Sequence, residues 1–233
     1  MDKPLSIIEI NHVYNGDCFE LFSLLDDDSV DHVFTSPPYN RRRNDKYAFY
    51  NDTIADYYGF LLKIVEEARR VARKYVFINL QINYYNASDV YALIGTYRDK
   101  IKQMIIWEKS NPLPANGNNV TNAYEIFLVI GESQLRSNTT YTKNVIHTSV
   151  YSKMPKEHKA VMHPDVADWF VKQFTQQGEV ILDPFIGIGT TGVACVRNNR
   201  NFIGFEIVKE YSDMANRNIE NAKTGHNGGD ANE

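Results

Sequence analysis

The chain has 233 residues, of which 43% are hydrophobic and 23% are charged, and its formal net charge is −4 at pH 7. These values are ordinary for a globular protein, and the length fits one large domain with a substantial core. The negative charge excludes a protein that holds a polyanion through an overall positive field, so any contact with a nucleic acid must use local basic patches.

The first half of the chain alternates between strand-like and helix-like hydrophobic patterns. Strands are predicted at residues 7–15, 30–34 and 75–80, and helices at residues 19–25, 56–73 and 87–100. Asp56 is a plausible N-cap for the second of these helices. Residues 40–56 have no sustained period, which predicts a long loop of the kind that is usually functional or disordered.

The second half begins with two β-type runs, 103–107 and 124–130, which predict an antiparallel hairpin. Residues 131–160 are polar and lack a core pattern, so we predict an excursion from the main fold. Strands then follow at 180–183 and 202–206, with helices at 166–176, from the turn after residue 183 to about 197, and at 208–222. This alternation predicts an α/β fold with a mostly parallel sheet, one domain over residues 1–222 and a flexible tail over 223–233.

Cysteine content and the N-terminus indicate the compartment. The two cysteines, Cys18 and Cys195, are too few for a disulfide scaffold and lack metal-ligand spacing. The six histidines show no such spacing either, so we predict no metal site. The first residues lack the apolar core of a secretory signal, and no segment has the roughly 20 apolar residues of a membrane span. We expect a soluble, cytoplasmic protein.

The tetrapeptide Ser36-Pro37-Pro38-Tyr39 follows the apolar strand 30–34 and ends it, because proline has no N–H to donate to a sheet. The loop offers carbonyl oxygens, the Ser36 hydroxyl and an aromatic ring in a stiff backbone. Acceptors beside a stacking surface suit a planar heterocycle with an exocyclic amine. The alternative is a plain turn, since Pro-Pro after a strand usually only stops the chain.

A strand–turn–helix near the other end of the chain carries a second pattern. Gly187 and Gly189 in its turn let a ligand approach the backbone, and the following helix points N–H groups toward it. Glu206 ends the next strand, where a carboxylate can accept both hydroxyls of a ribose. Asp183 before the turn would repel a pyrophosphate but attract the cationic groups of S-adenosylmethionine. The alternative is that the glycines serve only helix–strand packing.

Together the two patterns resemble the β class of exocyclic-amino DNA methyltransferases of bacteria and phages. The family's Asp-Pro-Phe-x-Gly-x-Gly-Thr-Thr pattern, which holds S-adenosylmethionine, matches residues 183–191, and its (Asp/Asn/Ser)-Pro-Pro-Tyr pattern, which holds the target amine, matches residues 36–39. The catalytic motif comes first, which is the permuted order of the β class. Further counterparts are Gly16-Asp17, His163-Pro164 and Gly204-x-Glu206. Residues 131–160 fall where the family places its target-recognition region.

The resemblance implies a Rossmann-like S-adenosylmethionine-dependent methyltransferase fold, with a mostly parallel seven-stranded sheet and a terminal antiparallel hairpin. It implies catalytic roles for Ser36, Pro37, Pro38 and Tyr39, and cofactor-binding roles for Asp17, Asp183, Phe185, Gly187, Gly189, Thr190, Thr191 and Glu206. Ile188 stands where many relatives have serine, which removes one hydroxyl contact. Serine at position 36, in place of aspartate, resembles the cytosine-N4 branch more than the adenine-N6 branch.

The predicted reaction is therefore site-specific methylation of DNA on the N4 amine of cytosine, with adenine-N6 methylation as the alternative. Ser36 Oγ and the Pro37 carbonyl would accept the amine hydrogens and localise the nitrogen lone pair. Duplex DNA hides this amine, so the base must be flipped and stacked on Tyr39. The adjacent run Arg41, Arg42 and Arg43 is predicted to hold flanking phosphates, although charge clusters are more often solvated surface.

Other functions use parts of the same pattern. Glutamine methylation of release factors also uses a Pro-Pro-Tyr site, but there the cofactor motif comes first. A non-catalytic partner subunit would keep the fold for DNA binding alone, and a dinucleotide oxidoreductase is a more remote alternative. The intact glycines, Asp183 and the tetrapeptide argue against decay of an active site. We expect double-stranded DNA, a second copy of the chain and a cognate restriction endonuclease of a restriction-modification system as partners.

Overall fold

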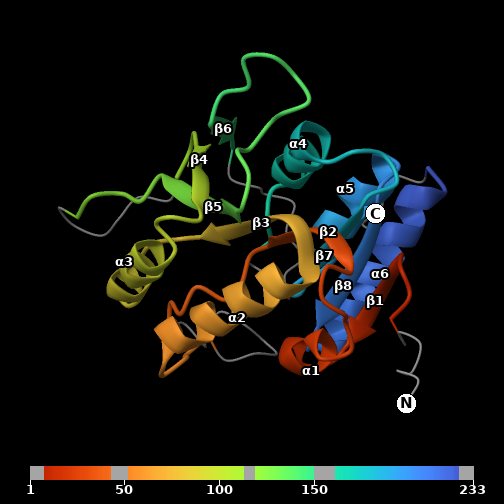
Figure 1. Cartoon of the computed structure of the whole chain (residues 1–233), viewed down its shortest axis with the longest axis horizontal. Coiled ribbons are helices and arrows are strands. Elements are labelled where there is room, and N and C mark those ends of the chain that lie inside the picture. Colours follow the sequence, from red (N-terminus) through yellow and green to blue (C-terminus); the bar gives the residue numbers. More distant parts are fainter. Residues whose placement is uncertain (1–7, 43–51, 113–118, 150–160, 226–233) are drawn as a thin grey trace, which may run out of the picture.

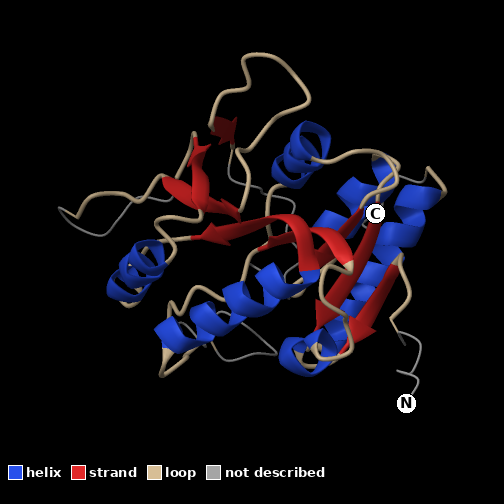
Figure 2. Ribbon diagram, in the orientation of Figure 1, coloured by secondary structure: helices blue, strands red, loops and turns tan. Residues whose placement is uncertain are grey.

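A twisted sheet of eight strands crosses the middle of the molecule in the order β1-β8-β7-β2-β3-β5-β4-β6 (Figures 1 and 2). The computed structural model describes residues 8–42, 52–112, 119–149 and 161–225. The strands are β1 His12–Asn15, β2 Val30–Thr35, β3 Ala72–Leu80, β4 Ile101–Lys109, β5 Tyr124–Gly131, β6 Val145–Thr148, β7 Val180–Asp183 and β8 Asn201–Glu206. The helices are α1 Cys18–Phe22, α2 Tyr57–Val71, α3 Ala87–Thr96, α4 Pro164–Phe174, α5 Thr190–Arg197 and α6 Lys209–Lys223.

Strand directions confirm the predicted α/β class and the predicted hairpin. Strand β5 is antiparallel to both β3 and β4, whereas the other pairs in the described sheet are parallel. The sheet has one strand more than the seven predicted. The additional strand, β6, lies within residues 131–160 and pairs with β4, where Trp107 Nε1 donates to Thr148 Oγ1 at 2.7 Å. Four residues with two adjacent apolar side chains are too short a pattern to identify from sequence.

Side chains of the central strands alternate between two separate hydrophobic cores, one on each face of the sheet. In β3, Val76 and Ile78 face one core, whereas Phe77 faces the other, as the period of two in a strand requires. Helices α1, α2 and α3 cover the first core, and α4, α5 and α6 cover the second (Figure 1). On the second face, the ring centroids of Phe127 in β5 and Phe170 in α4 are 4.3 Å apart. Two helical layers therefore enclose the sheet.

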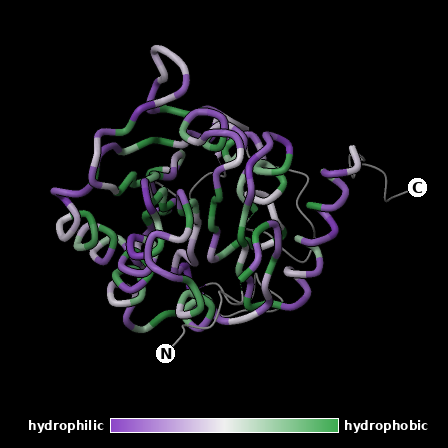
Figure 3. The backbone as a smooth tube through the Cα atoms, turned by 45° about the vertical axis from the view of Figure 1, so that its right-hand side comes forward, coloured by the Kyte–Doolittle hydropathy of each residue, from purple (hydrophilic) through white to green (hydrophobic). Residues whose placement is uncertain are grey.

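The helices carry the features that their sequences predict. Asp56 is confirmed as the N-cap of α2, since its Oδ1 accepts from Gly59 N at 2.9 Å. Figure 3 shows α6, the helix before the C-terminus, as mainly hydrophilic with short hydrophobic stretches, and it buries Tyr211, Ala215 and Ile219. No described helix is long and apolar enough to cross a membrane. Residues 226–233 of the predicted tail and 150–160 of the predicted excursion lie outside the described residues.

The order of strands reverses between β7 and β2. These two strands are hydrogen-bonded neighbours, with Val33 opposite Leu182. From β7 the chain moves outward in one direction to β8, beside which β1 lies at the edge, and from β2 it moves in the other direction to β3. Open α/β sheets bind ligands outside the carboxyl ends of the strands at such a reversal. The two sequence patterns follow these same strand ends.

Candidate active site

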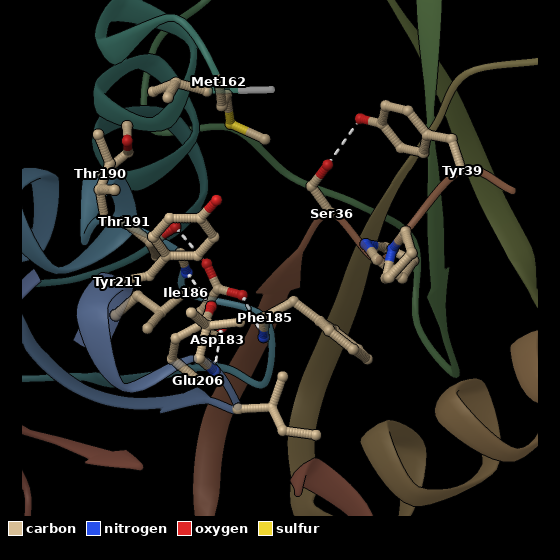
Figure 4. A pocket seen from close by; sticks show the side chains of 17 residues that line it. Ser36, Tyr39, Met162, Asp183, Phe185, Ile186, Thr190, Thr191, Glu206 and Tyr211 are labelled. Carbon is tan, nitrogen blue, oxygen red and sulfur yellow. Dashed lines mark hydrogen bonds between the residues drawn. The ribbon is translucent and has the colours of Figure 1, made fainter. Parts of the chain in front are cut away.

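One pocket opens at the carboxyl ends of β2, β7 and β8, and both sequence patterns line it (Figure 4). The predicted site residues in its wall are Ser36, Pro37, Pro38, Tyr39, Asp183, Phe185, Gly187, Thr190, Thr191 and Glu206. In Figure 4 the side chains of Ser36 and Tyr39 lie on one side of the pocket, and Asp183, Thr191 and Glu206 lie across from them. The fold thus brings together two patterns that are almost 150 residues apart in the chain, as Thr35 and Asp183 illustrate.

Asp183 ends β7 with its carboxylate turned into the protein. Oδ1 accepts hydrogen bonds from Thr35 Oγ1 at 3.0 Å and from Phe185 N at 3.1 Å, and Oδ2 accepts from Thr191 Oγ1 at 2.6 Å. Burial raises the pKa of this carboxyl to about 6, and the three hydrogen bonds offset only part of that effect. Asp183 therefore ties β2, the turn and α5 together. Its predicted attraction for a cofactor cation stays a prediction.

Glu206 ends β8 and faces the same pocket. Its Oε2 accepts from Gly187 N at 3.0 Å, and its Oε1 accepts from Val208 N at 2.8 Å. Burial raises the pKa of Glu206 to about 7, and the charge of Asp183 adds to this rise. A carboxylate oxygen can accept more than one hydrogen bond, so Glu206 has acceptor capacity left for ligand hydroxyls. Two such donors would stabilise the charge that burial disfavours, which fits the ribose role predicted for this residue.

The glycine turn is shaped by backbone requirements at Gly189. This residue caps α5 with φ of +93°, and a Cβ placed on it would lie 3.0 Å from the Cα of Ala215 in α6. Only glycine satisfies both the left-handed conformation and the close packing of the two segments. Thr190 and Thr191 open α5 behind it, and the Thr191 hydroxyl is committed to Asp183. The turn is thereby held in one position beneath the pocket.

Asp17 lies outside the pocket wall. It is the N-cap of α1, where its Oδ1 accepts from Phe19 N at 2.8 Å and from Glu20 N at 3.4 Å. Gly16 N donates to the Glu206 carbonyl at 3.0 Å, which places this turn beside the end of β8. The structure gives Asp17 a capping role, and its cofactor role stays a prediction.

The backbone of the tetrapeptide is held by side chains from two other segments. The Pro38 carbonyl accepts from Tyr57 OH at 2.8 Å, and the Tyr39 carbonyl accepts from Asn83 Nδ2 at 3.0 Å and Asn86 Nδ2 at 2.7 Å. Pro37 lines the pocket, and no hydrogen bond from another described residue reaches its carbonyl. The acceptor role predicted for the Pro37 carbonyl stays a prediction.

The side chains of Ser36 and Tyr39 join a polar network with Asn79, Glu125 and Lys109. Ser36 Oγ lies 2.6 Å from Tyr39 OH and donates to Asn79 Oδ1 at 3.2 Å. Tyr39 OH contacts Asn79 Oδ1 and lies 3.0 Å from Glu125 Oε2, and Lys109 forms an ion pair with the other oxygen of Glu125. Burial of the hydroxyl and the charge of Glu125 hold the pKa of Tyr39 well above its usual value. The phenol is thus fixed as a neutral group.

The predicted basic run takes up a different arrangement. The Arg41 guanidinium lies 5.1 Å from the centroid of the Tyr39 ring and covers one of its faces, so a base could stack only on the other. Arg42 is exposed, and its guanidinium lies 5.1 Å from the Tyr85 ring. Arg43 lies outside the described residues. The phosphate contacts predicted for this run stay predictions.

A stem closes the start of the loop that carries these arginines. Arg41 N donates to Asp52 Oδ2 at 2.8 Å, and Arg42 N donates to the Asp52 carbonyl at 2.9 Å. One step further in, the Asn40 amide exchanges two hydrogen bonds with the backbone of Ile54, at 3.0 and 3.1 Å. The chain therefore leaves and rejoins the fold at one point, directly after the tetrapeptide.

Sequence patterns missed the supporting residues of the site. Asn79 is fully buried in a strand whose other inward residues are apolar, and Glu125 is only 3% exposed in another such strand. A polar residue within an apolar strand is the signal that could have identified both. Tyr211 and the apolar residues Val161, Met162, Ile207 and Val208 also line the pocket without belonging to either pattern. Among the described residues, no cluster of histidine, cysteine or acidic side chains is arranged to hold a metal ion.

Comparisons with known proteins fit this geometry. A family model described as a DNA methylase, N6_N4_Mtase, matches residues 30–217. The type II methyltransferase M2.MboI of Moraxella bovis is 26% identical over 256 aligned positions, which cover 88% of this chain and 86% of that protein.

Two solved structures are similar over most of the chain. The PvuII DNA methyltransferase, described as cytosine-N4-specific, has a TM-score of 0.72 at 16% identity. The aligned part covers 91% of this chain and 92% of the PvuII chain. The M1.HpyAVI–SAM complex has a TM-score of 0.66 at 23% identity. The aligned part covers 89% of this chain and 98% of the M1.HpyAVI chain.

Proposed function

We propose one reaction for this chain, which belongs to the N6_N4_Mtase family of DNA methylases: transfer of a methyl group from S-adenosylmethionine to the exocyclic N4 amine of a cytosine in double-stranded DNA. Its fold is the Rossmann-like fold of such methyltransferases, with the tetrapeptide before the glycine turn as in the β class. The observation that carries the proposal is the single pocket lined by both patterns at the reversal between β7 and β2.

The residues on the β7 and β8 side of the pocket fit S-adenosylmethionine. Glu206 would accept the ribose hydroxyls with the lone pairs that its two backbone partners leave. The glycine turn gives the ligand close access to the backbone, and the exposed Ile207 next to Glu206 offers an apolar surface for the adenine ring. When bound, the cofactor supplies an electrophilic methyl group.

The residues on the β2 side would prepare the amine. Its lone pair is delocalised into the base, which makes the nitrogen a poor nucleophile. Ser36 Oγ and the free Pro37 carbonyl would accept its two hydrogens and orient the nitrogen toward the cofactor half of the pocket. The face of Tyr39 opposite Arg41 would stack on the flipped base, while Arg41 holds the ring from behind.

Support for cytosine comes from Ser36, which leads the tetrapeptide where aspartate would favour adenine, and from the likeness to the cytosine-N4-specific PvuII enzyme. The test is to express the chain in a host without endogenous methylation, digest the DNA to nucleosides and identify the modified base. We expect N4-methylcytosine. N6-methyladenine would support the alternative substrate, and DNA free of methylation together with intact binding of S-adenosylmethionine would indicate a partner subunit.

Truncation of Tyr39 tests the stacking surface. Tyr39→Ala removes the ring, so methyl transfer should fall by roughly tenfold or more, as loss of about 1–3 kcal/mol of stacking implies. Binding of S-adenosylmethionine should stay near normal, because Tyr39 lies across the pocket from Glu206. Tyr91→Ala, on the exposed side of α3, is the control. Equal methylation rates for all three proteins would show that the tetrapeptide is only a turn.

A further inference from the structure

The inward partners of Ser36 and Tyr39 are all acceptors. Asn79 presents Oδ1 to both hydroxyls, because its Nδ2 is turned to the Ile126 carbonyl at 3.3 Å. Glu125 presents Oε2 to Tyr39 OH, while its Oε1 is held by Lys109. Neither an amide oxygen nor an ionised carboxylate can donate a hydrogen.

Counting hydrogens gives the network a direction. Ser36 and Tyr39 have one hydroxyl hydrogen each, and two buried acceptor groups, Asn79 Oδ1 and Glu125 Oε2, require them. The two hydroxyl oxygens lie 2.6 Å apart, but a hydrogen that one donates to the other is no longer available to an inward acceptor. In every arrangement that satisfies the acceptors, both hydrogens stay inside the network. Ser36 Oγ then presents only lone pairs to the pocket that it lines.

We propose that Asn79 and Glu125 are positioning residues that make Ser36 Oγ an acceptor-only group, so that the pocket selects a base with an exocyclic amine over the same base with an exocyclic carbonyl. The Pro37 carbonyl, itself only an acceptor, acts in the same sense. A carbonyl oxygen in the pocket would face two acceptors with no donor between them. This inference deepens the proposed function and rests on it.

The experiment measures binding of two duplexes. One carries the base that the enzyme methylates, and the other carries its deaminated counterpart at that position, uracil for cytosine or hypoxanthine for adenine. The wild type should bind the amine duplex about tenfold more tightly. Deamination also weakens base pairing, which affects the affinity for the second duplex. Because this effect is the same for every variant, the ratio of the two affinities is compared between proteins.

The informative variant is the double substitution Asn79→Leu with Glu125→Gln. Lys109 would hold the amide oxygen of the new glutamine and turn its N–H toward Tyr39. Tyr39 would then donate to Ser36, and the Ser36 hydrogen would point into the pocket. The ratio of the affinity for the amine duplex to the affinity for the deaminated duplex should fall to about one or below. Each single variant should keep most of the wild-type ratio, because one inward acceptor remains.

Two further variants complete the design. Glu132→Gln makes the same exchange just beyond the other end of β5, where the carboxylate is exposed and pairs with Arg69 and Lys100, and should leave the ratio unchanged. Ser36→Ala removes the hydroxyl itself and should lower the ratio even if the double variant does not fold. The inference is overturned if the wild type binds both duplexes equally, or if Ser36→Ala and the folded double variant keep the wild-type ratio. A wild type that methylates no DNA would instead contradict the proposed function.

Discussion

The two halves of the pocket are built in different ways. The cofactor half is formed by Asp183, Glu206 and the glycine turn after Asp183. Most of its contacts join residues close in the chain, as between Asp183 and Phe185 or between Glu206 and Val208. In the half for the base, the contacts join Ser36 to Asn79 and Tyr39 to Glu125, which lie 43 and 86 residues apart. The first half is therefore nearly complete within one stretch of sequence, whereas the second exists only after the sheet has formed.

The halves also differ in how they hold buried charge. Glu206 and Asp183 are bonded to N–H and hydroxyl groups, and burial raises the pKa of both. Glu125 is paired with Lys109. A carboxylate without a cation is a group that a ligand can still stabilise, and a paired one is a group that holds its neighbours in place. A bound ligand can therefore still stabilise the charges of the cofactor half, whereas the charge of Glu125 in the half for the base is already paired with Lys109 before a ligand binds.

Asp183→Ala should have the largest effect and tests whether the cofactor half contains a structural brace. The substitution leaves Thr35, Thr191 and Phe185 N without their shared acceptor. Unsatisfied buried donors cost about 1–3 kcal/mol each, part of which relaxation recovers, so the free energy of unfolding should fall by about 3 kcal/mol. Denaturant unfolding measures this, with Asp213→Ala on α6 as the control. A stable Asp183→Ala protein that has lost only cofactor affinity would make Asp183 a ligand.

The pH dependence of cofactor binding tests the unpaired Glu206. The pKa of its carboxyl in the folded protein is about 7, above the ordinary 4.5, so it contributes stability below pH 4.5 that is lost as the pH rises to about 7. Ribose hydroxyls bind best to the ionised form. Affinity for S-adenosylmethionine should therefore rise about tenfold from pH 6 to pH 8 and then level off.

Titration calorimetry at pH 6, 7 and 8 measures this dependence. The Glu206→Gln variant has no charge to titrate, so its affinity should be weaker and should change little over the same range. A slope as steep in that variant as in the wild type would assign the titration to another group.

Arg42→Ala should have the smallest effect, and it tests the phosphate contact predicted beside the half of the pocket for the base. Loss of one phosphate contact should lower the slope of log affinity against log salt concentration by about 0.9. Binding at low salt should weaken slightly and equally for all sequences. Arg98→Ala, exposed after α3, is the matched control. Equal slopes for all three proteins would leave Arg42 as a side chain that only stacks on Tyr85.

Sequence alone predicted the parts of the molecule that depend on neighbours in the chain. The α/β class, the antiparallel hairpin and the Asp56 cap all rest on short periods or short spacings, and the structure confirms them. The sequence also predicted that both patterns lie at strand ends, and the structure brings them together in one pocket. Strand β6 was missed because four residues give no period, and Asn79 and Glu125 were missed because their partners come from other strands.

The stem formed by Asn40, Arg41, Arg42, Asp52 and Ile54 has a consequence for how this enzyme could diversify. Because its hydrogen bonds close the chain directly after the tetrapeptide, whatever lies between residues 42 and 52 can change in length or composition without a change in the geometry of Ser36 or Pro37. Chimeras that exchange only the residues between Arg42 and Asp52 among related enzymes should therefore keep their chemistry.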